Sequence, residues 1–307
     1  MRNITSDSMI WLTSLFLVSG CTPTALQVPD SGKQQVSEEK NLRNRILRKL
    51  EGKETEQKQT ILLEIISNPN DKPLRRDAIR YLNGILQEVN SLSKPLTELF
   101  LLETDSAVVS DLKALLSNKE FDVDDYLLNA TTTANETQHL RIIEILGLRK
   151  ASTPGAILYF KEHLRRKNAQ LFIQACEAIV DVGAPARVLL PELIAAAAQP
   201  RIAMAPNNAK AARDSRDKIY AAVRAIDAVG PDEDAVATLI TLLSMEEVIA
   251  ASAADALAQL EGKATAAIPA LKKLLERDDH EGRDLKSKIA KESAERALAK
   301  IQASAFP

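Results

Sequence analysis

One segment decides the fold: Glu177-Ala178-Ile179-Val180-Asp181-Val182-Gly183. Close copies of it are Arg224-Ala225-Ile226-Asp227-Ala228-Val229-Gly230, Asp255-Ala256-Leu257-Ala258-Gln259-Leu260-Glu261 and Arg296-Ala297-Leu298-Ala299-Lys300-Ile301-Gln302. Three looser copies begin at Asp77, Asp111 and Arg141. The seven starting points are 34, 30, 36, 47, 31 and 41 residues apart. Self-similarity at such spacings is typical of proteins built from stacked repeats.

Each copy has the pattern of an amphipathic helix. In one of them the apolar residues fall on a single helical face: Ile219, Ala222, Val223, Ile226 and Val229. Most copies are preceded by a second apolar run, and the clearest runs are 60–66, 188–194, 236–243 and 267–275. Gly183 and Gly230 suit helix C-termini, and Pro185 and Pro231 suit entry into the next helix. The pattern therefore predicts repeated helical hairpins.

A known repeat family shows this arrangement. The unit that opens with Ala267-Ile268-Pro269-Ala270-Leu271 and closes with Ala294-Glu295-Arg296-Ala297-Leu298 resembles a HEAT repeat, of the bacterial variety shared with phycobilisome-lyase-like repeats. The resemblance covers about residues 54–302. It implies an all-α protein, a right-handed α-solenoid of about seven HEAT-like helical hairpins. A generic helical bundle is the alternative fold.

Alanine recurs at one register position of these units. We expect it to be buried where helices cross too closely for a larger side chain, and the positions are Ala78, Ala178, Ala225, Ala256 and Ala297.

The composition is that of a packed helical protein. Of 307 residues, 45% are hydrophobic and 27% charged, which argues against disorder throughout. Only 4% are aromatic, which disfavours a β-sandwich. A net charge of −2 argues against nucleic-acid binding by the whole molecule.

The N-terminus has the pattern of an export signal. Residues Met9 to Val18 form an apolar run that is too short to span a bilayer but suits a signal peptide. The following string Leu17-Val18-Ser19-Gly20-Cys21 resembles the lipobox of bacterial lipoproteins, which implies lipidation of Cys21 and cleavage before it. Arg2 is the only positive side chain ahead of this run, so an unrelated apolar start of the chain is the alternative.

These patterns divide the chain into four parts. We expect a signal peptide at 1–20, a lipidated cysteine and flexible tether at 21–37, a capping helix at 38–53 and the repeat array at 54–307. Two insertions within the array, 199–214 and 277–284, are predicted to be loops.

The sequence offers no recognisable catalytic machinery. It contains no glycine-rich phosphate loop, no Gly-x-Ser-x-Gly and no His-Glu-x-x-His. The histidines, His139, His163 and His280, have no metal-ligand spacing and are interpreted as surface or packing residues. We interpret Cys176 as a buried thiol, and the acids at 122–125 as the first turn of a helix. We therefore expect no catalytic residue, no metal, no cofactor and no small-molecule substrate.

Charge is segregated along the array. Residues 98–139 hold nine acids and two bases, residues 140–224 hold seven acids and fourteen bases, and residues 225–307 hold fifteen acids and ten bases. We predict that the basic part contacts an acidic protein partner through Arg149, Lys150, Lys161, Arg165, Arg166 and Lys167. Neutral drift would give the same segregation. Basic residues without interleaved aromatics make nucleic acid a poor candidate.

These observations lead to one expected function. We expect a lipoprotein scaffold that presents its helices to a protein partner in the bacterial cell envelope. Thr22 follows the lipidated cysteine and favours the periplasmic side of the outer membrane over the inner membrane. An accessory or assembly factor of an envelope enzyme or machine is the alternative. An enzyme of unrecognised, lyase-like type is a weaker one.

Overall fold

The computed structural model describes residues 43–85, 90–199, 209–277 and 285–305. Residues 43–50 are helical. The helices that follow are α2 (Thr55–Ser67), α3 (Lys72–Asn83), α4 (Ser93–Leu102), α5 (Ser106–Leu116), α6 (Asp124–Ala130), α7 (Glu136–Leu148), α8 (Pro154–Leu164), α9 (Ala169–Val182), α10 (Leu190–Ala197), α11 (Ala209–Val229), α12 (Val236–Leu242), α13 (Glu247–Gln259), α14 (Ile268–Leu275) and α15 (Leu285–Ala305). Short 3-10 segments are η2 (Asn90–Leu92), η3 (Ala184–Leu189), η4 (Glu233–Ala235) and η5 (Glu261–Ala267). No strand occurs among these residues.

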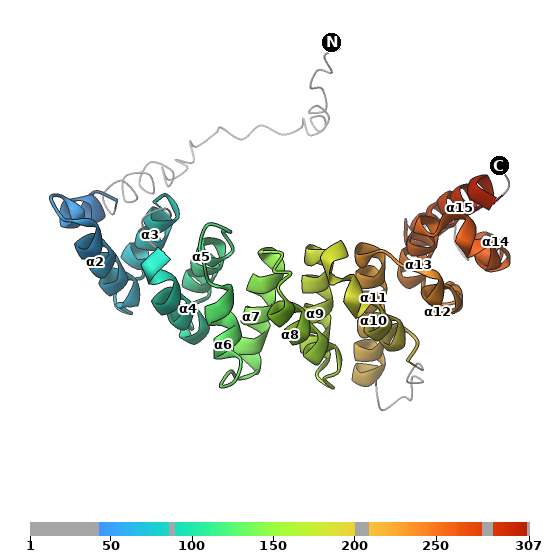
Figure 1. Ribbon diagram of the computed structural model, residues 1–307, viewed down its shortest axis with the longest axis horizontal. Helices are drawn as coiled ribbons and strands as arrows, with labels where there is room; N and C mark the ends of the chain where they lie inside the picture. The colour runs from blue at the N-terminus through green and yellow to red at the C-terminus, as the bar shows by residue number, and fades with distance from the viewer. Residues whose placement is uncertain (1–42, 86–89, 200–208, 278–284, 306–307) are drawn as a thin grey trace, which may run out of the picture. The chain divides into compact units, whose positions relative to one another are not determined.

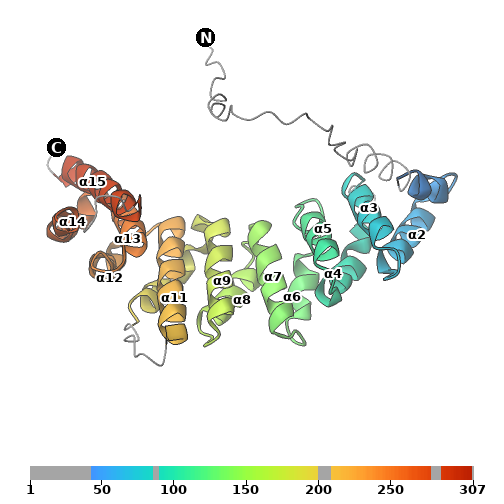
Figure 2. The ribbon, with the colours of Figure 1, turned by 180° about the vertical axis from the view of Figure 1, so that it is seen from behind.

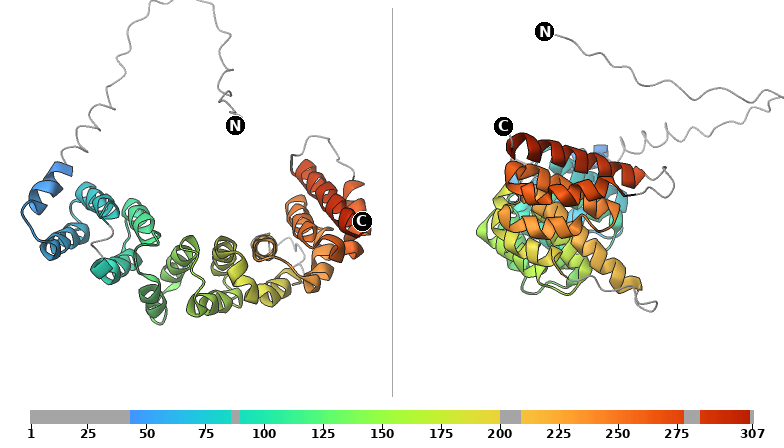
Figure 3. Two further views of the ribbon diagram at one scale, coloured as in Figure 1. Left: turned by 45° about the horizontal axis from the view of Figure 1, so that its top comes forward. Right: turned by 90° about the vertical axis from the view of Figure 1, so that its right-hand side faces the viewer.

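The helices α2 to α15 form seven consecutive hairpins in the described part of the chain, from α2–α3 to α14–α15. The hairpins follow one another in chain order (Figure 1; Figure 2). Second helices pack on second helices, as in α7–α9–α11–α13–α15, and first helices pack on first helices, as in α4–α6–α8–α10. The two resulting layers are seen from other directions in Figure 3. The prediction of an all-α solenoid of about seven helical hairpins is confirmed.

The register of the repeats is also confirmed. Each of the seven sequence copies lies in a second helix: α3, α5, α7, α9, α11, α13 and α15. The five recurrent alanines are all buried, at 1% exposure or less. Gly147 of α7 shows how close the helices approach, because a Cβ atom there would lie 2.7 Å from the Cα of Ala178. Small side chains at these crossings are therefore required by space.

Helix ends follow the expected chemistry. Gly183 has φ 71° after α9 and Gly230 has φ 84° after α11, a backbone conformation that glycine adopts without strain. Pro185 lies at the start of η3, which leads directly into α10. Asp124 and Asp125 form the first turn of α6, as predicted.

One predicted loop is partly wrong. The insertion 199–214 was expected to be irregular to its end, but α11 already begins at Ala209. Residues 209–213, Ala-Lys-Ala-Ala-Arg, are strong helix formers, so helix propensity extends α11 backward over them. Residues 200–208 of this insertion and 278–284 of the second lie outside the described residues.

Arginines tie consecutive hairpins together. Arg141 of α7 donates to the carbonyl oxygens of Phe100 at 2.6 Å and Glu103 at 2.8 Å, at the end of α4. Arg277 donates to the carbonyl oxygen of Met245 at 2.9 Å, just after α12. The last carbonyl groups of a helix have no partner within it and carry partial negative charge. A guanidinium group from a following element therefore satisfies them and joins two repeats.

Candidate functional site

A strongly charged hollow lies beside the end of α8. We call it the basic groove. It has a volume of about 600 Å³ and is lined by the turn after α8, by α10 and by one residue of α11. Its charged and polar lining residues are Arg165, Arg166, Lys167, Glu192, Gln199 and Lys218.

The turn that carries three of these bases is short. Helix α8 ends at Leu164, and Asn168 already caps α9, with its side-chain oxygen accepting from Gln170 N at 2.9 Å and Leu171 N at 3.2 Å. Residues 165–167 are thus confined between two helix ends. Positive charge is favourable at a helix C-terminus, so these bases also suit the end of α8 electrostatically.

One carboxylate neutralises part of the groove. Glu192 of α10 contacts Lys161 Nζ at 2.6 Å and Arg165 Nη2 at 3.4 Å. Burial tends to raise the pKa of Glu192, but the hydrogen bond from Lys161 and the charges of Lys161 and Arg165 together lower it below its usual range. Glu192 is therefore ionised and shared between two bases.

The remaining bases of the groove keep their charge toward solvent. Arg166 and Lys167 are exposed, and neither is in a salt bridge with another described residue. Lys218 lies over the ring of Phe172, with Nζ 4.5 Å from the ring centroid. That contact fixes a lysine side chain at the groove without removing its charge. The groove therefore offers anchored and free positive charge to an anionic ligand.

The predicted partner-binding residues do not all lie in one place in the structure. Lys161, Arg165, Arg166 and Lys167 lie together at the C-terminal end of α8. Lys150 is exposed but precedes α8, with φ 55°. The eleven residues of α8 span about 16 Å, so Lys150 lies near the opposite end of that helix.

Arg149 must be removed from the predicted surface. Its side chain is buried, with 8% of the residue exposed. It pairs with Asp124 and donates to the carbonyl oxygens of Leu116 and Asn118, at the end of α5. A sequence window shows its charge but not these partners, which lie 25 to 33 residues away.

Two histidines meet in a way that the sequence did not predict. His139 of α7 and His163 of α8 have ring centroids 5.0 Å apart. His139 Nδ1 lies 2.7 Å from the Tyr159 hydroxyl, and His163 Nδ1 donates to the Tyr159 carbonyl oxygen at 2.8 Å. Burial, with Arg166 nearby, lowers the pKa of both histidines. The packing interpretation of these two residues is confirmed; the spacing of His163 four residues after Tyr159 was the available signal.

Cysteines, metal ligands and membrane-spanning helices were the other features to consider. Cys176 is buried and free, and burial raises the pKa of its thiol, as the sequence interpretation expected of a packing residue. Within the described ranges, no three His, Cys, Asp or Glu side chains gather as metal ligands would. Across the same ranges, none of the helices combines the length and apolar character needed to cross a bilayer. Cys21 lies outside the described residues.

The fold places the chain among helical repeat proteins, and comparisons with known proteins add little to that. No protein-family model matches the sequence, and no curated protein matches it. Among solved structures, one engineered protein is 19% identical, with 79% of this chain and 98% of that chain covered and a TM-score of 0.38. A second is 17% identical, with coverages of 86% and 97% and a TM-score of 0.37.

Human deoxyhypusine hydroxylase in complex with glycerol is also similar, at 15% identity. The match covers 80% of this chain and 86% of that one, with a TM-score of 0.32. Similarity at this level supports no argument about activity or ligands. The function must therefore be argued from the basic groove and from the sequence.

Proposed function

We propose that this chain is a lipid-anchored scaffold of the bacterial cell envelope whose basic groove binds an acidic segment of a partner protein. The observation that carries the proposal is the groove itself, whose lining contains four bases, Arg165, Arg166, Lys167 and Lys218, against the single carboxylate of Glu192. Such an excess of positive charge in a hollow attracts an anionic ligand and speeds its association.

The anchor and the repeat type belong to the same proposal. The lipobox-like string ending at Cys21 supports lipidation, and Thr22 supports the outer membrane. The loose motif of Ala267–Leu271 and Ala294–Leu298 supports HEAT repeats of the phycobilisome-lyase-like kind. Stacked helical repeats commonly present extended binding surfaces, which fits a scaffold.

The anchor is tested by Cys21→Ser in the full chain. The wild-type protein should partition into the detergent phase and the variant should not, because several acyl chains bind a membrane far more strongly than one or none. Identical partitioning and identical gel mobility of the two proteins would show that Cys21 carries no lipid.

The groove is tested by the triple change Arg165→Glu, Arg166→Glu and Lys167→Glu. The probe is a glutamate-rich peptide of about 15 residues, which is about 50 Å long when extended and can follow the whole groove. The association rate should fall at least about tenfold at low salt, and the difference should shrink as salt screens the charges. Folding should be spared, because exposed ion pairs contribute only about 0–1 kcal/mol.

Lys150→Glu provides the matched control. It reverses an exposed base near the opposite end of α8, so it changes the net charge but not the groove. If Lys150→Glu reduced the association rate as much per reversed charge as the triple change does, the peptide would be responding to the overall charge of the protein. The proposed site would then be wrong.

A further inference from the structure

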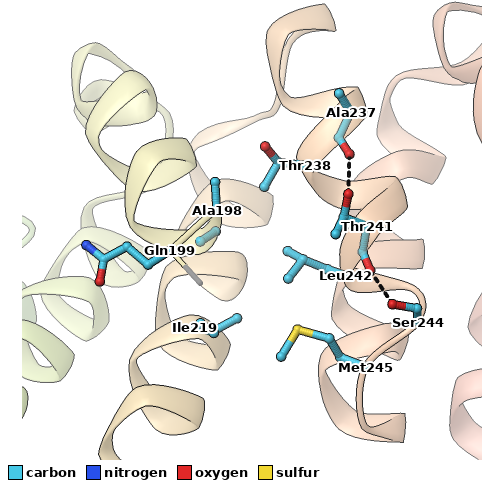
Figure 4. Close-up of a pocket in the computed structure, with 10 residues that line it drawn as sticks. Ala198, Gln199, Ile219, Ala237, Thr238, Thr241, Leu242, Ser244 and Met245 are labelled. Atoms are coloured by element: carbon cyan, nitrogen blue, oxygen red, sulfur yellow. Dashed lines mark hydrogen bonds between the residues drawn. The ribbon is translucent and has the colours of Figure 1, made fainter. Parts of the chain in front are cut away.

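A second hollow adjoins the basic groove. We call it the apolar pocket. It has a volume of about 470 Å³ and lies between the end of α10, Ile219 of α11, Leu242 of α12, and Met245, which follows α12. Figure 4 shows Ile219, Leu242 and Met245 around this space. Ligand sites in proteins have volumes of about 300–1,000 Å³, so the pocket has room for one large side chain or a small molecule.

The walls of the apolar pocket offer little hydrogen bonding. The Thr241 hydroxyl donates to the Ala237 carbonyl oxygen at 3.1 Å, and the Ser244 hydroxyl donates to the Thr241 carbonyl oxygen at 2.8 Å (Figure 4). These two hydroxyl protons are therefore already used within α12 and its end. Apart from the Thr238 hydroxyl and the Gln199 amide, the side chains that line the space present mostly methyl, methylene and thioether surface, which favours an aliphatic or aromatic group.

The two hollows lie on either side of the end of α10. Gln199 lines both of them. Its side chain extends away from Leu242 and Met245 in Figure 4. On α11, Lys218 lines the basic groove and the next residue, Ile219, lines the apolar pocket. Because the hollows share Gln199 as a border, one extended segment of a partner, at about 3.3 Å per residue, can reach both of them.

We propose that the basic groove and the apolar pocket form one site for an acidic peptide segment that carries a single large apolar anchor residue. The inference rests on the proposed function and adds a requirement to it. Carboxylates would lie among Arg165, Arg166, Lys167 and Lys218 while the anchor side chain fills the pocket. The charges set the association rate, and the buried anchor slows dissociation.

The test uses pairs of glutamate-rich peptides. The two peptides of a pair differ at one position, which is leucine in one and serine in the other. The variable position differs from pair to pair, so that the set covers the length of the peptide. The folded wild-type chain should bind the best leucine peptide about tenfold or more tightly than its serine partner, because burying a leucine side chain corresponds to at least one factor of ten.

The variant Ala198→Trp fills the pocket from its exposed rim. We expect it to abolish the leucine advantage while leaving the serine peptide unchanged. Ala299→Trp on the exposed side of α15 is the control for an added tryptophan, and circular dichroism confirms folding of both variants.

The outcomes separate the two proposals. Equal binding of both peptides to the wild type, each weakened by charge reversal at 165–167, would overturn the anchor and leave the proposed function standing. A leucine advantage that survives Ala198→Trp would overturn the placement of the anchor. A leucine advantage seen only after Ile202→Ser would mean that residues between Gln199 and Ala209 fill the pocket, which also overturns the proposal. Peptides indifferent to charge reversal would instead contradict the proposed function.

Discussion

Replacing Arg149 by methionine should destabilise the array strongly, although Arg149 lies on no binding surface. Methionine keeps an unbranched apolar side chain but removes the guanidinium group, with its charge and its donors. The Arg149 guanidinium donates to the carbonyl oxygens of Leu116, at 3.0 Å, and Asn118, and pairs with Asp124. The change leaves the Leu116 carbonyl and the Asp124 carboxylate without this partner, whereas the Asn118 carbonyl keeps its hydrogen bond from Phe121 N at 3.1 Å.

The magnitude follows from burial. The Arg149 side chain is 7% exposed and that of Asp124 is 24% exposed, so solvent screens the pair only in part. Removing one member of a buried pair costs about 3–5 kcal/mol, and partial exposure of Asp124 places this case near the lower figure. A loss of about 3 kcal/mol lowers the Tm of a domain of this size by about 6–12 °C.

The assay is urea and thermal unfolding followed by circular dichroism, with Arg166→Met as the matched control. Arg166 is exposed and has no salt bridge to a described residue, so its loss should change the free energy of unfolding by less than about 0.5 kcal/mol. Hydrogen exchange should show faster opening at the α5–α6 boundary in Arg149→Met alone. Equal unfolding midpoints for the two variants would refute the distinction between the two arginines.

Three further changes test packing and charge. Gly147→Ala should cost about 1–3 kcal/mol in thermal melting, because its Cβ would meet Ala178 at 2.7–2.8 Å; an unchanged Tm would contradict the close crossing. Ala256→Arg should cost more than this, since an unpaired charge would enter a fully buried position, and wild-type stability would place that alanine at the surface. Burial lowers the pKa of His139 and His163 in the folded protein. Below the ordinary histidine pKa of about 6.5 the unfolded chain therefore binds more protons than the folded one. The free energy of unfolding should consequently fall as the pH drops below that value. A His139→Gln, His163→Gln protein should show a flatter dependence of the urea midpoint on pH, and an equally steep one would assign the effect to other groups.

The fold was predictable because its signal is local. A helical face repeats every three or four residues, so the Ile219, Ala222, Val223, Ile226 and Val229 pattern needs only one short window. All five are buried in α11. The recurrence of an alanine in five of the seven units then indicated the register of the hairpins, because only small residues fit where Gly147 meets Ala178.

The contacts between hairpins were not predictable in the same way. Arg149 and Arg166 are both bases beside a helix end, and nothing in their neighbouring residues separates them. Their difference depends on residues 25 or more positions away, since Asp124 and the end of α5 pack against Arg149. The contact between His139 and His163 likewise arises from the packing of α7 on the following helix, not from ligand spacing.

The charge segregation acquires a different meaning once these contacts are known. Residues 140–224 hold fourteen bases, but several of them act within the array. Arg141 and Arg149 bind carbonyl groups of preceding repeats, and Arg187 donates to the Pro231 carbonyl oxygen at 3.4 Å. A count of charges therefore overstates the positive charge that a partner can meet. Three of the exposed bases stand side by side in the turn at 165–167, in a groove that Lys218 also lines and that an apolar pocket adjoins. The reason to look for a partner at this groove is therefore where these bases lie, and not the net charge of the segment.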